Sequence, residues 1–201
     1  MKKLLIVCEE KYKVFADYLA QLISLEDDTE EKSVGVTDGE VSAQVWLEND
    51  YKSNSAQIAS NQYIVFIGQN KLIKEKSSHM KVVFSQYGIN YGWLGKQAVV
   101  TVNKAIQIED YDEFLHYALN YQNDLEKLTE KKDAKEENKI KVAGNDEKRA
   151  LTLVKQAAAI APQIGSNFLR KRAYNKKIEQ QQYSFAIMKF YIDYLAEFLG
   201  M

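Results

Sequence analysis

The residues best suited to chemistry lie in a segment of glycines and aromatic side chains. The segment Tyr87–Lys96 contains three glycines and three aromatic residues. Glycine lets a backbone approach a ligand closely, and an aromatic ring offers a flat face on which a planar molecule stacks. Together with the residues that end the preceding strands, the segment predicts a site for a planar small molecule. The predicted binding residues are Gly68, Gln69, Asn70, Ser85, Gln86, Tyr87, Gly88, Tyr91 and Trp93.

Side chains for catalysis or metal binding are sparse. Cys8 falls inside an apolar run and is expected to be buried, whereas His79 and His116 lie far apart with no motif around them. No pair of cysteines or histidines has the spacing of metal ligands. Glu9 and Glu10 follow a strand, where adjacent side chains point to opposite sides. We therefore predict no catalytic residue and no metal ligand, and an enzymatic activity stays open.

Five short apolar segments predict the β strands that hold these residues in place. The segments cover residues 4–8, 41–47, 63–67, 81–85 and 98–102, and helical or irregular stretches separate them. Strands that alternate with helices are typical of a parallel sheet covered on both faces. We predict an α/β fold: a doubly wound, five-stranded parallel sheet of order 2-1-3-4-5 with a C-terminal helical extension. Ligands of such sheets bind outside the carboxyl ends of the strands.

Two of these segments resemble flavodoxins. Val82–Gly88, followed by Gly92 and Trp93, is similar to the fourth strand of short-chain flavodoxins and the loop that contacts the flavin ring. Tyr63–Gly68 resembles the third flavodoxin strand with its terminal glycine. The resemblance spans about half of the chain. It implies a flavodoxin-like protein that binds FMN, or a nucleotide-like planar molecule, at the strand carboxyl ends.

The phosphate-binding loop of flavodoxins has no counterpart here. That loop is rich in Ser, Thr and Gly and follows the first strand, whereas Cys8–Tyr12 carries two glutamates at this place. Their negative charges would repel a phosphate. We therefore expect an altered or repurposed site on a flavodoxin-like scaffold.

Two other doubly wound families give weaker matches. A phosphorelay receiver would use Ser85 and Lys104, but residues 68–70 replace its phosphoacceptor aspartate. A Toll/interleukin-receptor-like enzyme, which consumes NAD, would need a glutamate after the third strand, and Glu75 is the candidate. The second match leaves an enzyme as an open hypothesis.

The sequence divides into three parts. We expect a flavodoxin-like α/β domain over residues 1–125, a charged connector over residues 126–146 and a helical tail over residues 147–201. Apolar residues of the tail recur every seven positions, which predicts a narrow apolar seam along one helix. These residues are Ile178, Phe185, Ile192 and Leu199.

The seam must pack against another surface. We expect it to dock on the preceding helix, around residues 151–161, or on a second copy of the chain. The second option gives an alternative function: a non-catalytic interaction or oligomerisation protein that forms a homodimer through its C-terminal helix.

Composition excludes several partners. The formal net charge of −1 offers no long-range attraction to nucleic acid. A local basic cluster over residues 170–177 is either an anion-binding patch or a solvated helix face. No apolar run approaches the roughly 20 residues of a membrane span. With one cysteine and no signal-peptide pattern, the expected location is the cytoplasm.

Overall fold

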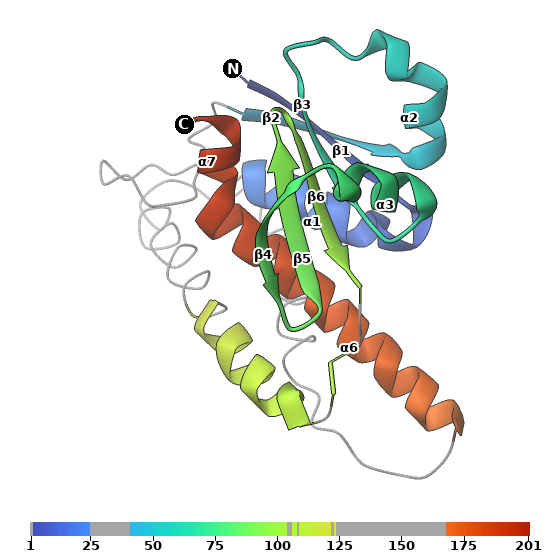
Figure 1. The fold of residues 1–201 in the computed structure, drawn as a ribbon, viewed down its shortest axis with the longest axis vertical. Helices are drawn as coiled ribbons and strands as arrows, with labels where there is room; N and C mark the ends of the chain where they lie inside the picture. Colours follow the sequence, from blue (N-terminus) through green and yellow to red (C-terminus); the bar gives the residue numbers. More distant parts are fainter. Residues whose placement is uncertain (1, 25–40, 104–105, 108, 122, 124–167) are drawn as a thin grey trace, which may run out of the picture.

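Six strands form one mixed sheet at the centre of the molecule (Figure 1). The computed structural model describes residues 2–24, 41–103, 106–107, 109–121, 123 and 168–201. The order across the sheet is β2-β1-β3-β6-β5-β4; β1, β2, β3 and β6 run parallel, and β5 runs antiparallel to both neighbours. The strands are β1 (Lys2–Cys8), β2 (Val41–Leu47), β3 (Tyr63–Ile67), β4 (Lys81–Gln86), β5 (Ile89–Leu94) and β6 (Gln97–Val102).

All five predicted strands are present, but the predicted sheet is wrong in strand number and order. The segment of glycines and aromatic residues after β4 is not a loop, because Ile89–Leu94 pairs with β4 as a hairpin. Tyr87 and Gly88 close this hairpin with positive φ angles of 52° and 71°, as a tight turn requires. The hairpin puts β4 at the sheet edge and leaves β6 beside β3. The fold is therefore α/β with a six-stranded mixed sheet, rather than a five-stranded parallel sheet of order 2-1-3-4-5.

Helices cover both faces of the sheet (Figure 1). One face carries α2 (Glu48–Asn54), the 3-10 turn η2 (Ser55–Gln57) and α3 (Lys71–Ser78). The other face carries the 3-10 turn η1 (Glu10–Tyr12), α1 (Lys13–Ser24) and α6 (Phe168–Lys189). α6 continues through a π-helical turn, η3 (Phe190–Tyr194), into α7 (Leu195–Leu199), and a further helix spans residues 109–121.

Alternation along the strands divides the core into two clusters. Leu4 and Ile6 of β1 face α1 and α6, whereas Leu5 and Val7 face α2 and α3. Successive side chains of a strand point to opposite faces, so a strand covered on both sides is apolar throughout. This is why continuous apolar runs located the strands correctly.

The C-terminal helix is part of the core. Residues 181–191 are all buried, so this stretch of helix is covered on every side. Phe185 packs against Phe114 with ring centroids 5.5 Å apart, and Tyr183 stacks on Phe15 of α1 at 5.4 Å. Because this chain's own sheet and helices cover the apolar seam, a homodimer through it gains no support. The connector and residues 151–161 lie outside the described residues.

Candidate functional site

Most of the predicted binding residues lie at one end of the sheet, where the parallel strands have their carboxyl ends. Residues 68–70 follow β3, and the turn at residues 87–88 joins β4 to β5 at the same end of the sheet. The backbone N–H of Asn103, just after β6, donates to the carbonyl of the second turn residue at 2.9 Å. The Gln69 amide donates to the carbonyl of Val102, at the end of β6. The predicted segments are therefore linked through β6.

The carboxylate of Glu9 occupies the place at this end of the sheet where the phosphate of a ligand would bind. Glu9 Oε1 accepts hydrogen bonds from the backbone N–H groups of Gln69 at 2.7 Å and Asn70 at 2.8 Å. Asn70 is the N-cap of α3, so Glu9 lies where a helix N-terminus favours an anion. Gly68 leaves room for it, since a Cβ there would lie 2.6 Å from Glu9 Oε1. A ligand phosphate has no access to these two N–H groups while Glu9 holds them.

The predicted amide side chains are engaged as well. Asn70 Oδ1 accepts a hydrogen bond from the backbone N–H of Ile73 at 2.9 Å, and its Nδ2 donates to Glu48. Besides the carbonyl of β6, Gln69 Nε2 has Glu179 Oε1 of α6 at 3.4 Å. These amides hold the strand ends together instead of offering donors to a ligand.

Helix α6 packs against the same end of the sheet. The Tyr12 hydroxyl donates to Glu179 Oε1 at 2.5 Å, and the Tyr183 hydroxyl accepts from the backbone of β6 at 3.3 Å. Gln182 Nε2 donates to the carbonyl of the β4–β5 turn at 2.5 Å. Burial raises the pKa of Tyr183 to about 12 and also raises the pKa of Tyr12, so both hydroxyls stay protonated at neutral pH. The C-terminal helix thus occupies part of the crevice expected for a flavodoxin-type ligand.

Two predicted ligand contacts pack into the core. Tyr91 is 1% exposed and stacks on Phe84 with ring centroids 4.9 Å apart. Trp93 lies toward the opposite end of β5, 6.0 Å from the rings of Tyr194 and Phe198. Since side chains alternate along a strand, both rings share the face that the C-terminal helix covers. These two rings, predicted to stack on a ligand, therefore pack against η3, α7 and β4.

A cavity of 370 Å³ lies beside the β4–β5 turn. Gln86, Tyr87 and Gly88 line it together with Asp110 and Glu113. The left-handed φ of Tyr87, 52°, costs a residue with a Cβ about 1 kcal/mol. Its hydroxyl donates to Glu113 at 3.3 Å, which helps to hold the turn. The described lining has two carboxylates and no basic side chain, so this cavity disfavours a phosphate. Ser85 is exposed and donates across the hairpin to Asn90 at 2.5 Å.

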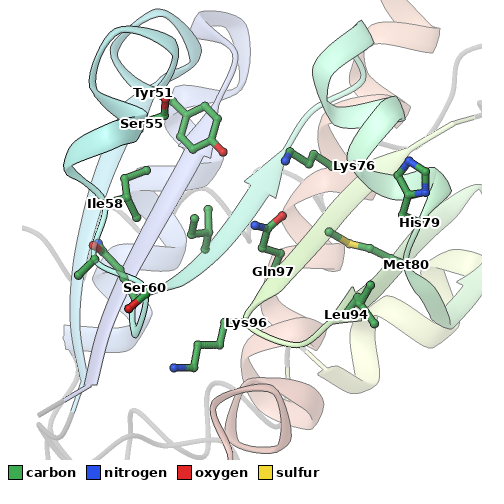
Figure 2. A pocket seen from close by; sticks show the side chains of 13 residues that line it. Tyr51, Ser55, Ile58, Ser60, Lys76, His79, Met80, Leu94, Lys96 and Gln97 are labelled. Carbon is green, nitrogen blue, oxygen red and sulfur yellow. The ribbon is translucent and has the colours of Figure 1, made fainter.

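A second cavity, of 520 Å³, lies on the sheet face that α2 and α3 cover (Figure 2). Its floor is Ile64 of β3 and Gln97 of β6, and the β5–β6 turn closes one end. One wall comes from α2 and the segment that leads to β3, and the other from α3 and the residues that follow it. The lining of this α2–α3 pocket is Tyr51, Ser55, Ile58, Ala59, Ser60, Gln62, Ile64, Lys76, His79, Met80, Leu94, Lys96 and Gln97.

The α2–α3 pocket is basic. Lys76, His79 and Lys96 line it, and its lining contains no aspartate or glutamate. Within the described residues neither lysine pairs with a carboxylate. Instead, Lys76 Nζ lies 5.8 Å from the ring centroid of Phe66, and Lys96 Nζ lies 5.6 Å from that of Tyr63. In a chain with a net charge of −1, this local excess of positive charge favours an anion.

Sequence reasoning missed this pocket because its basic residues come from separate elements. Lys76 belongs to α3, His79 follows α3, and Lys96 lies in the turn between β5 and β6. The one signal in the sequence is the spacing of Lys76, His79 and Met80, which puts them on one side of a helix. Nothing local indicates that the turn at Lys96 lines the same pocket as that helix.

The other candidate chemical groups are dispersed. Burial raises the pKa of the Cys8 thiol to about 12, which disfavours the thiolate that a nucleophile needs. Glu75 and His116 are exposed on different helices, and Lys104 lies outside the described residues. In the described ranges, no three His, Cys, Asp or Glu side chains gather in a way that could hold a metal ion.

Two further features bear on partners. Lys176 and Lys177 of the basic cluster are exposed on α6, and the side chains of residues 170–174 lie outside the described part of the structure. Among the helices that the structure describes, none combines the length and apolar character that crossing a membrane requires. The basic cluster therefore stays a prediction.

Comparison with known proteins assigns no family to this chain. No family model, no curated protein and no solved structure matches it. The resemblance of two segments to flavodoxins therefore stays a prediction.

Proposed function

We propose that this chain is a binding protein for a small anionic molecule, which it holds in the α2–α3 pocket. The observation that carries the proposal is the composition of the lining: three basic side chains and no acid, beside a floor of one apolar and one amide side chain. Small-molecule sites are mostly apolar cavities of about 300–1,000 Å³ with a few polar groups. The volume of 520 Å³ and the mixed lining fit that description.

The lining of the pocket combines apolar and polar groups. Ile58, Ile64 and Met80 give part of the pocket an apolar lining, whereas Lys96 and His79 are exposed to solvent. Gln97 and the serines of the α2 wall supply hydrogen-bonding groups that fix the orientation of a ligand. These groups suit an organic anion better than a bare inorganic ion.

Thermal unfolding in the presence of small anions tests the proposal. A ligand at about 100 times its Kd stabilises a folded protein by about 2.7 kcal/mol, which raises the Tm measurably. We expect stabilisation by phosphate- or carboxylate-bearing compounds and its loss in the double variant Lys76→Gln/Lys96→Gln. Lys74→Gln is the matched control, because Lys74 is exposed on α3 and does not line the pocket. Equal stabilisation of the double variant and the wild type would contradict the proposal.

A second candidate function uses the cavity beside Tyr87. Its lining favours this candidate, since Gln86, Tyr87 and Gly88, three of the residues predicted to bind a planar ligand, meet there. This candidate keeps the planar ligand predicted at the strand ends, including a flavin, but Asp110 and Glu113 favour a neutral or cationic ring over FMN. Its test is the absorbance spectrum of the purified protein and titration with riboflavin and FMN. Binding of riboflavin that Tyr87→Ala removes would support it, and a colourless protein that binds neither would refute it.

A further inference from the structure

Lys76 and Tyr51 face each other across the α2–α3 pocket, beside the ring of Phe66. Lys76 Nζ lies 5.8 Å from the ring centroid of Phe66, and the Tyr51 ring meets the same ring edge-on with centroids 5.3 Å apart. Figure 2 shows the Lys76 side chain reaching from α3 toward the hydroxyl of Tyr51 on α2. Phe66 belongs to the core cluster that α2 and α3 cover, so both groups lie on the pocket's face of the sheet.

The other two basic residues of the lining are placed differently. Lys96 and His79 are exposed, whereas Lys76 is half-buried. Lys96 Nζ lies 5.6 Å from the ring centroid of Tyr63, and that ring packs on Phe198 of α7, on the opposite face of the sheet. Lys76 is therefore the basic residue best placed to hold an anion inside the pocket.

Three hydrogen-bond donors gather around this part of the pocket. Besides the ammonium of Lys76, they are the hydroxyl of Tyr51 and the side-chain amide of Gln97, which reaches up from the floor (Figure 2). Burial raises the pKa of Tyr51, so its hydroxyl keeps its proton at neutral pH. Within the described residues, none of these three side chains has a hydrogen-bond or ion-pair partner. All three can therefore donate to a bound anion.

The floor next to these donors is mostly apolar. Gln97 of β6 pairs with Ile64 of β3 on one side and with Leu94 of β5 on the other. Residues paired across strands project from the same face, so the two apolar side chains flank the amide there. Ile58 and Met80 add apolar surface from the two walls (Figure 2). Because Leu94 is 63% exposed, an apolar group that covers it removes apolar surface from water.

From this arrangement we infer that the ligand is an amphiphilic monoanion, a carboxylic acid with an apolar body. The inference rests on the proposed function, because it specifies the ligand of the same pocket. The carboxylate accepts hydrogen bonds from Lys76, Tyr51 and Gln97. The apolar body lies on Ile64 and Leu94.

The number of charges decides between a carboxylate and a phosphate. One ammonium balances the single charge of a carboxylate, whereas a phosphate monoester carries about two charges at neutral pH. A second anionic group at the far end of the ligand would have to lie on the apolar floor, where its loss of hydration is not compensated.

Calorimetric titration of the full chain with straight-chain carboxylates tests the inference. The probes are butyrate, hexanoate and octanoate, with octanol as the uncharged analogue, octyl phosphate as the phosphate analogue and suberate as the acid with a carboxylate at both ends. We expect the affinity to rise about twofold for each added CH₂ group up to octanoate. Octanoate should bind at least about tenfold more tightly than octanol or suberate, and more tightly than octyl phosphate.

Variants locate the two ends of the ligand. Lys76→Gln and Tyr51→Phe should each lower the affinity for octanoate about tenfold, because each removes a donor to the carboxylate. Leu94→Ser should weaken octanoate more than butyrate. The matched controls are Lys74→Gln and Val82→Ser, at exposed positions outside the lining, and they should leave binding unchanged. A melting curve for each variant confirms that it is folded.

The outcomes separate the two proposals. If Lys76→Gln weakens binding but all chain lengths bind equally, or suberate or octyl phosphate binds more tightly than octanoate, the pocket binds anions and the monoanion inference is overturned. If Lys96→Gln weakens octanoate as much as Lys76→Gln does, the placement of the carboxylate is overturned. If no anionic probe binds, if octanol binds as tightly as octanoate, or if binding ignores both lysines, the proposed function itself fails.

Discussion

Replacing Glu9 tests whether its carboxylate stands in for a ligand anion. Glu9 accepts two backbone hydrogen bonds, from Gln69 at 2.7 Å and Asn70 at 2.8 Å, and its side chain is 18% exposed. A hydrogen bond to a charged group contributes about 1.5–3 kcal/mol, against about 0.5–1.5 kcal/mol for a neutral one. Glu9→Gln keeps an acceptor oxygen but loses the charge, so the free energy of unfolding should fall by about 1–2 kcal/mol.

Glu9→Ala removes the acceptor altogether. Water can reach a site of this exposure and replace part of the lost bonding, so we expect a loss of about 2–4 kcal/mol and a Tm lower by roughly 5–10 °C. The measurement is urea unfolding followed by circular dichroism, with Glu10→Ala as the control because Glu10 is exposed.

The same variant carries a second, more specific expectation. With the carboxylate gone, the N–H groups of Gln69 and Asn70 form a vacant anion site at the start of α3. Phosphate should therefore stabilise Glu9→Ala more than it stabilises the wild type. A Glu9→Ala protein as stable as Glu10→Ala, with no added response to phosphate, would refute this account of the strand ends.

Three further predictions concern stability. Gly92→Ala should cost about 3 kcal/mol, because the new Cβ would lie 2.3 Å from the backbone carbonyl of Lys81; urea unfolding measures this, and a neutral effect would contradict the hairpin geometry. Lys189→Met should also cost about 3 kcal/mol, because it leaves the partly buried carboxylate of Asp193 without its cation; Lys189→Met/Asp193→Leu should recover part of the loss in the same assay. Cys8 should resist thiol reagents until the protein unfolds, because its side chain is buried. Since burial raises its folded-state pKa to about 12, only the unfolded chain loses the thiol proton above about pH 8.5. Wild-type stability should therefore fall more than that of Cys8→Ala between pH 7 and pH 10, by about 2 kcal/mol, and equal losses would contradict the burial of the thiol.

The sequence predicted the parallel strands well because they are covered on both faces. A strand such as β3 reads as the continuous apolar run Tyr63–Ile67, which few other elements produce. β5 was misjudged because Gly92 and Asn90 interrupt its apolar residues. The alternation of Ile89, Tyr91 and Trp93 was the signal for a strand there.

The candidate site was less accessible to sequence reasoning. The two glutamates after β1 predicted that a phosphate would be repelled, and the structure shows Glu9 in contact with the N–H groups that a phosphate would need. The role of α6 in closing that edge depends on contacts across more than 160 residues, such as Tyr12 with Glu179, which no local pattern encodes. The α2–α3 pocket likewise exists only once the fold has brought the β5–β6 turn and α3 to the same cavity.

The most direct measurement of the central claim is an NMR titration of the protein, labelled with nitrogen-15, with a small organic anion such as octanoate. Binding in the α2–α3 pocket should shift the backbone amide signals of Tyr51, Ile64, Lys76 and Gln97, which line it. The amides of residues 68–70 and 87–88, at the opposite end of the sheet, should stay in place. Shifts confined to those strand-end residues, or no shifts at any concentration, would contradict the claim that this pocket binds an anion.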